Sequence, residues 1–130
     1  MNIVLDTNIL VSAMWSPDGN AAKVVEAILT NRFTICYDRQ IAEEYNKVLR
    51  YPKLKFKEDD ITAFLEPVLD YGLGIINYPK TDAIFDRDET DRKFYDVGKS
   101  CGAKIITGNL RRFPDDEDVM SLADFVEQYL

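Results

Sequence analysis

Histidine is absent from the 130-residue sequence, and cysteine occurs only twice, at Cys36 and Cys101. Without histidine, the chain cannot use a Ser-His-Asp or Cys-His hydrolase scheme, nor histidine as a general acid or base. The two cysteines form no C-x-x-C pair, so we expect no zinc site and two small, buried, reduced thiols. Any hydrolytic chemistry must therefore depend on carboxylates, lysine, tyrosine or a metal ion.

Long apolar runs are also missing. No segment approaches the length of a membrane span, and no basic-plus-apolar leader opens the sequence. With 46% hydrophobic and 30% charged residues, the composition is typical of a soluble globular protein. We therefore expect one domain over residues 1–130, located in the cytoplasm and without a membrane partner.

Positive charge is scarce relative to negative charge, and the formal net charge is −7. An acidic balance argues against a nucleic-acid partner. Net charge is an average, however, and carboxylates that bind a divalent cation do not repel phosphate once the metal is in place. The basic residues are clustered between positions 50 and 57 and at Arg111-Arg112. Each cluster is either a phosphate-binding patch or a solvated charged loop.

Alternating strand and helix patterns run along the whole chain. Apolar, β-branched runs predict strands at 2–5, 33–37, 74–78 and 104–107, with a short fifth at 119–121. Helical spacing predicts helices at 20–31, from Asp38 to just before Pro52, at 58–71, 91–101 and 122–129, with a kink or break at Pro67. This alternation predicts an α/β fold: a three-layer α/β/α sandwich around a four- to five-stranded, mainly parallel sheet.

Four oxygen-bearing side chains fall at related places in this layout. Asp6 ends the first strand, Glu44 lies in the helix after the second, Asp91 begins the helix before the fourth, and Asn109 follows the fourth. If the first and fourth strands are neighbours, all four converge at one edge of the sheet, where α/β proteins place their chemistry. Each also has an ordinary structural explanation, as a helix cap, an exposed helix residue or a turn residue.

A divalent cation gives a reason to gather such side chains. Carboxylates placed together repel one another, and a bound cation removes that penalty. Mg²⁺ and Mn²⁺ prefer hard oxygen ligands, commonly one or two carboxylates with water and substrate phosphate. Such a metal can activate water for phosphodiester hydrolysis without histidine. We therefore interpret Asp6, Glu44 and Asp91 as candidate metal ligands, with Asn109 beside them.

Four segments in this order resemble the PIN-domain (PilT N-terminus-like) family, and more closely its VapC-like toxins of toxin–antitoxin pairs. They are IVLDTNIL at 3–10, EYNKVLRYPK at 44–53, DETDRKFY at 88–95 and IITGN at 105–109. The resemblance implies a Mg²⁺- or Mn²⁺-dependent ribonuclease. It implies Asp6, Glu44 and Asp91 as its catalytic acids and metal ligands, and Thr107 as the hydroxyl residue before the final acid.

The chain departs from that family at its last acidic position, where it has Asn109 in place of the usual aspartate. Asparagine keeps an oxygen ligand but removes one negative charge, so a second metal is in question, and Asp88, Asp115 and Asp116 are candidates for compensation. The resemblance further implies an RNA substrate, a cognate antitoxin protein and a homodimer. The basic residues that we expect at the RNA backbone are Arg50, Lys53, Arg92 and Arg111.

Two other functions are compatible with parts of the sequence. One is an aspartate-based phosphotransfer domain, but a haloacid-dehalogenase pattern needs a second aspartate where this chain has Asn8. A response-regulator pattern needs its aspartate on a later strand. The other is a PIN-like module that binds RNA or a protein partner without catalysis, weakened by Asn109.

Overall fold

The computed structural model describes residues 1–85 and 88–130, and its centre is a parallel sheet of five strands in the order β3-β2-β1-β4-β5. The strands are β1 (Asn2–Leu5), β2 (Thr34–Tyr37), β3 (Leu73–Gly74), β4 (Lys104–Thr107) and β5 (Val119–Ser121). The α-helices are α1 (Thr7–Trp15), α2 (Asn20–Leu29), α3 (Arg39–Leu49), α4 (Glu58–Asp70), α5 (Arg92–Ser100) and α6 (Leu122–Tyr129). Short 3₁₀ turns are η1 (Pro52–Leu54), η2 (Glu89–Asp91) and η3 (Leu110–Arg112). The predicted α/β/α fold is confirmed.

The central strand β1 pairs with β2 on one side and β4 on the other. Ile3 lies opposite Ile35 of β2, and Val4 and Leu5 lie opposite Ile105 and Ile106 of β4. Ile3, Val4 and Leu5 are fully buried, as expected for a parallel strand with both faces covered. The predicted neighbourhood of the first and fourth strands is therefore confirmed, and the carboxyl ends of β1 and β4 meet at the same edge.

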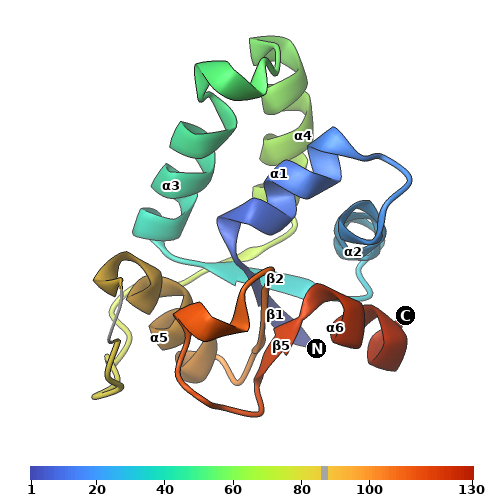
Figure 1. Ribbon diagram of the computed structural model, residues 1–130. Coiled ribbons are helices and arrows are strands. Elements are labelled where there is room, and N and C mark those ends of the chain that lie inside the picture. Colours follow the sequence, from blue (N-terminus) through green and yellow to red (C-terminus); the bar gives the residue numbers. More distant parts are fainter. Residues whose placement is uncertain (86–87) are drawn as a thin grey trace.

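Helices cover the two faces of this sheet. Figure 1 shows α1, α2, α3 and α4 on one side and α5 on the other, and the neighbouring strands β1, β2 and β4 all contact α5. The close approach of α5 depends on Gly98, because a Cβ atom there would lie 2.6 Å from Cδ1 of Ile105. The residues at the N-terminal end of α5 are thus held beside the end of β1.

One local prediction was wrong, and one of two alternatives predicted at Pro67 does not hold. The third strand was expected over 74–78 but contains only Leu73 and Gly74. The chain then leaves the sheet: Asn77 has a left-handed backbone (φ 54°), and the Tyr78 hydroxyl donates to Asp38 of the α3 cap at 2.6 Å. The break allowed for at Pro67 does not occur, because α4 runs through it with Ile61, Leu65 and Val68 buried on one face.

Cys36 is fully buried in β2, as expected, whereas Cys101 at the end of α5 is half-buried. Both carry free thiols. In the part of the chain that the structure describes, none of the helices has the length and apolarity needed to cross a membrane.

Candidate functional site

Asp6 lies at the carboxyl end of β1, directly before α1, and is 2% exposed. It occupies the N-cap position of α1, but its side chain makes no capping hydrogen bond among the described residues. Its Oδ2 instead accepts a hydrogen bond from Thr107 Oγ1 at 2.8 Å and lies 3.6 Å from Arg112 Nη1. Burial raises the pKa of Asp6, although Thr107 and Arg112 act in the opposite direction. The side chain thus points across the sheet edge and does not close the helix.

Asp91 lies opposite, at the end of η2, and is 1% exposed. Its Oδ2 accepts a hydrogen bond from Nε of Arg112 at 2.8 Å, and its Oδ1 accepts one from Nη2 of the same residue. Burial raises the pKa of Asp91, against the lowering effect of Arg112. One guanidinium therefore contacts both buried carboxylates, so Asp6 and Asp91 lie within reach of a single cation.

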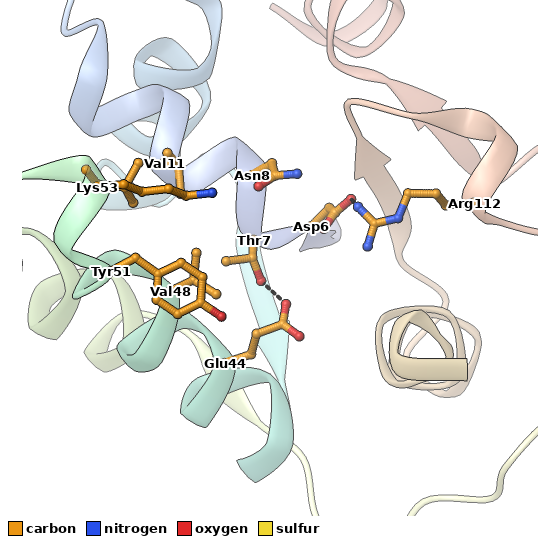
Figure 2. A pocket seen from close by; sticks show the side chains of 10 residues that line it. Asp6, Thr7, Asn8, Val11, Glu44, Val48, Tyr51, Lys53 and Arg112 are labelled. Atoms are coloured by element: carbon orange, nitrogen blue, oxygen red, sulfur yellow. Dashed lines mark hydrogen bonds and ion pairs between the residues drawn. The ribbon is translucent and has the colours of Figure 1, made fainter. Parts of the chain in front are cut away.

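Glu44 approaches from α3 and is half-buried. One carboxylate oxygen accepts a hydrogen bond from the hydroxyl of Thr7, and the other lies 2.8 Å from Lys93 Nζ. Figure 2 shows the Glu44 carboxylate turned toward Thr7, beside Asp6. Its negative charge contributes to the raised pKa of Asp6, after the larger effect of burial. Glu44 therefore belongs to the same site but has its own basic partner.

Tyr45, the residue after Glu44, ties three elements of the site together. It is fully buried, and its hydroxyl donates to the carbonyl of Leu5 in β1 at 2.5 Å. Its ring lies 6.4 Å from that of Phe94 in α5. Burial raises the pKa of Tyr45 well above its ordinary value, so the hydroxyl keeps its proton and remains a donor. The elements that carry Asp6, Glu44 and Asp91 are thus joined below the acids.

A pocket of about 310 Å³ opens beside these acids. Figure 2 shows Asp6 and Arg112 at one end, Thr7 and Glu44 in the middle, and Val48, Tyr51 and Lys53 at the other end. The pocket therefore has an acidic end and an end that combines apolar, aromatic and basic side chains. Its lining residues are Asp6, Thr7, Asn8, Val11, Glu44, Val48, Tyr51, Lys53, Leu54 and Arg112.

The other predicted site residues lie around this centre. Thr107, at the end of β4, is buried and bonded to Asp6, and the Asn109 backbone N–H donates to its hydroxyl at 3.0 Å. The Asn109 side chain is exposed and accepts from the Arg111 backbone N–H at 3.2 Å. Asp88 is exposed and accepts from the Thr90 N–H and hydroxyl, which lower its pKa. Asn109 and Asp88 thus have structural partners in their own turns.

The four predicted RNA-contacting residues differ in their surroundings. Lys53 is exposed and lines the pocket, and Arg111 is exposed on η3. Arg50 points to Glu58, with a shortest ion-pair distance of 2.6 Å, and Arg92 pairs with Glu89 at 2.7 Å. Of the four, Lys53 therefore lines the pocket, at the end away from Asp6, and the two paired arginines would have to exchange partners to bind phosphate.

The donor set suits a hard divalent cation held mainly by two carboxylates. Asp6 and Asp91 already share one positive group, and Mg²⁺ is commonly held by one or two carboxylates with water. Within residues 1–85 and 88–130, no group of three or more acidic or thiol side chains lies close enough together to hold a metal ion directly. Glu44, which is held by Thr7 and Lys93, would accordingly act through water.

Three contributors to this site were not identified from the sequence. Arg112 was noted only as part of a basic pair, although it bridges two acids, and Thr7 and Lys93 were not assigned to Glu44. Arg112 lies three positions after Asn109, at the end of a 3₁₀ turn. Because residues three apart in such a turn lie on the same side, this spacing could have indicated that Arg112 faces the site. Thr7 follows Asp6 directly, but adjacency alone gives no signal for the direction of its hydroxyl.

Comparison with known proteins agrees with this arrangement. Residues 2–111 match the PIN domain, a family whose members are typically nucleases that use divalent metals. An uncharacterized protein of Methanocaldococcus jannaschii is 29% identical over 125 residues, which cover 95% of this chain and 76% of that protein. No solved structure matches the chain significantly. With the family match covering most of its length, and the acids at the shared edge of β1 and β4, the chain belongs to the PIN-domain family.

Proposed function

We propose that the protein is a Mg²⁺- or Mn²⁺-dependent endoribonuclease that hydrolyses RNA phosphodiester bonds. The observation that carries this proposal is that Asp6 and Asp91, both buried, contact the same guanidinium beside Glu44. Burial raises the pKa of both carboxyls, so their charged forms need a cation beside them, and carboxylate oxygens are the ligands that Mg²⁺ and Mn²⁺ prefer. Membership of a nuclease family supports this chemistry.

In this proposal, Asp6 and Asp91 would hold the metal, and Glu44 would act through water. The metal supplies an activated water and stabilises negative charge on the phosphate. Thr107 fixes the orientation of Asp6 through its hydroxyl, and Thr7 does the same for Glu44. Asn109 assists indirectly, because its backbone N–H positions the Thr107 hydroxyl. Lys53 and Arg111 are the first candidates for contact with the RNA backbone, followed by Arg92 and Arg50.

We further propose that the protein is the toxin of a toxin–antitoxin pair, with a cognate antitoxin as partner and a homodimer as its own assembly. The support is its similarity to PIN-family toxins in the segments that carry Asp6, Glu44, Asp91 and Asn109. Growth arrest on expression, relieved by co-expression of the protein encoded beside it, would be the expected result. Unimpaired growth on expression of an active nuclease would contradict the toxin role.

The nuclease proposal is tested by replacing the acids one at a time. We expect Asp6→Asn and Asp91→Asn to lower Mn²⁺-dependent cleavage of a labelled single-stranded RNA by about 100-fold or more, because each removes a charged metal ligand. Glu44→Gln should also reduce cleavage, whereas Glu43→Gln is the matched control. Glu43 is the exposed neighbour on α3 and pairs only with Arg39, at 2.9 Å, among the described residues. Equal cleavage by Asp6→Asn and the parent, with unchanged circular dichroism, would refute the assignment.

A non-catalytic PIN-like module is the second candidate, and one specific observation favours it. Arg112 already neutralises both buried acids, and the chain has Asn109 in place of a fourth acid. In such a module, Arg112 would be a permanent structural partner and not a displaceable one. Absence of Mn²⁺ binding together with retained RNA binding would support this module over the nuclease.

A further inference from the structure

The end of the pocket that lies away from the buried acids has the character of a ligand site. Tyr51 and Lys53 line it together with Val11, Val48 and Leu54, while Asn8 lies toward the acids. The Lys53 Nζ lies 6.0 Å from the centre of the Tyr51 ring, so an aromatic face and a positive charge are presented together. Aromatic faces beside basic groups are the usual platform for the bases and backbone of single-stranded nucleic acids.

The backbone at Tyr51 has a defined turn geometry. Tyr51 precedes Pro52, which favours its extended conformation (φ −60°, ψ 128°), and its carbonyl accepts from the Leu54 N–H at 3.0 Å. The turn is closed by Lys55 in a left-handed conformation (φ 60°). Tyr51 is nevertheless 36% exposed, and among residues 1–85 and 88–130 no hydrogen bond involves its hydroxyl. Hydrogen bonding of the Tyr51 hydroxyl within the described residues therefore does not explain why this ring lies at the surface.

The size of the pocket and its continuity with the acids limit what could bind. At about 310 Å³ it lies at the lower end of the ligand-pocket range, which suits one planar group and not a large ligand. Figure 2 shows Glu44 between Tyr51 and Asp6, so a group against Tyr51 would lie toward Glu44. A chain that enters here must also present a phosphate to the acids and a negative charge to Lys53. A nucleotide next to the reacting phosphate meets these conditions. Its base is a planar group of the right size, one phosphate reaches the acids, and another brings a negative charge to Lys53.

On this basis we propose that Tyr51, Val48 and Lys53 form a subsite for one RNA base next to the scissile phosphate. This inference rests on the proposed ribonuclease function and adds a base-binding position to it. The base stacks on the Tyr51 ring over the apolar floor, and Lys53 contacts the adjoining phosphate. Asn8 lies at the exposed rim, where its amide can hydrogen-bond to a base edge.

The test combines a protein substitution with removal of the base from the RNA. Binding of five-nucleotide single-stranded RNAs is measured by fluorescence anisotropy in an Asp6→Asn background, with one abasic position moved along the RNA. Stacking of this kind is worth about 5- to 10-fold in affinity at a partly exposed ring, so Tyr51→Ala should weaken binding by ~5–10-fold. In the protein with Tyr51, removing the base at one position of the RNA should also weaken binding by ~5–10-fold. In Tyr51→Ala, removing the same base should weaken binding by less than about 2-fold.

Matched variants separate stacking from other effects. Tyr51→Phe keeps the ring and should bind like the parent, whereas Tyr71→Ala removes an exposed tyrosine that lies outside the pocket and should change nothing. Unchanged RNA affinity in Tyr51→Ala, or additive losses at every abasic position, would refute the subsite and favour a protein side chain as the occupant. If the protein that keeps Asp6 still cleaves RNA in that case, the ribonuclease function stands and only the subsite is refuted. Loss of both cleavage and RNA binding in the parent would instead overturn the function and the subsite together.

Discussion

Arg112 is the basic side chain that touches both buried acids, and this side chain is 30% exposed. Burial lowers the pKa of Arg112, but its bonds to Asp91 and its proximity to Asp6 outweigh this and raise it. The residue therefore stays charged and competes with any other cation for the same carboxylates. On the proposed function, we expect it to stabilise the metal-free protein and to weaken metal binding at the same time.

Replacing Arg112 should separate these two effects. We expect Arg112→Met to destabilise the metal-free protein by about 1–3 kcal/mol, because Asp6 and Asp91 lose their cation. The same variant should bind Mn²⁺ several-fold more tightly in calorimetric titration, since no guanidinium has to be displaced. Arg111→Met is the control: Arg111 lies on the same turn but forms no ion pair with either acid among the described residues. Weaker Mn²⁺ binding by Arg112→Met would show that the arginine is not a competitor.

The packing of α5 against β1 and β4 is the element-scale feature on which the position of Asp91 depends. Gly98 is buried there, with Ile105 and Val4 as its nearest neighbours. Gly98→Ala would gain up to about 1 kcal/mol of helix propensity. We still expect a net loss of about 1–2 kcal/mol in unfolding free energy, because the new methyl group overlaps the fully buried Ile105 side chain.

Chemical denaturation measures this loss, and Gly108→Ala provides its control. A Cβ atom at Gly108, directly after β4, would have no heavy atom within 4 Å, so its effect should stay within about 0.5 kcal/mol. Equal stability of Gly98→Ala and the parent would mean that α5 can move away from the sheet. In that case the distance between Asp91 and Asp6 would not be fixed by this contact.

The sequence was sufficient to predict most elements, because their periodicity is strong. The strands at 2–5, 104–107 and 119–121 agree with β1, β4 and β5. The strand at 74–78 failed since apolar Ile75 and Ile76 suggested strand continuation, whereas the chain leaves the sheet through Asn77 and the Tyr78–Asp38 contact. That contact joins residues 40 positions apart and has no local signal.

Long-range contacts also limited the prediction of the site. Asp6 and Asp91 could be selected because one follows a strand and the other begins a helix at the edge where parallel strands end. Glu44 could be selected because it lies in the helix after the second strand, on the side that faces the sheet. Their partners could not be selected: the bonds of Arg112 to Asp91 and of Thr107 to Asp6 depend on side-chain directions set by tertiary packing. Sequence patterns therefore indicated that Asp6 and Asp91 lie at one edge of the sheet, and the structure was needed to show that Arg112 lies between them.

For the molecule as a whole, metal binding should appear as increased thermal stability. A ligand that binds only the folded state at 100 times its dissociation constant adds about 2.7 kcal/mol, or roughly 5–15 °C in Tm for a domain of this size. We expect Mn²⁺ to raise the Tm of the parent and of Glu43→Gln by roughly 5–15 °C. Asp6→Asn should show little change. An equal Tm increase in Asp6→Asn would indicate that the stabilising ion binds elsewhere.

Tyr45 helps to bring the elements that carry the acids together during folding. Its hydroxyl bond to Leu5 and its packing on Phe94 fix β1, α3 and α5 relative to one another without any contribution from an ion. The conformational entropy of bringing the acids together is therefore lost once, during folding, and not again at each encounter with a ligand. If the proposed metal binds here, its capture would resemble the exchange of one counter-ion, the Arg112 guanidinium, for another.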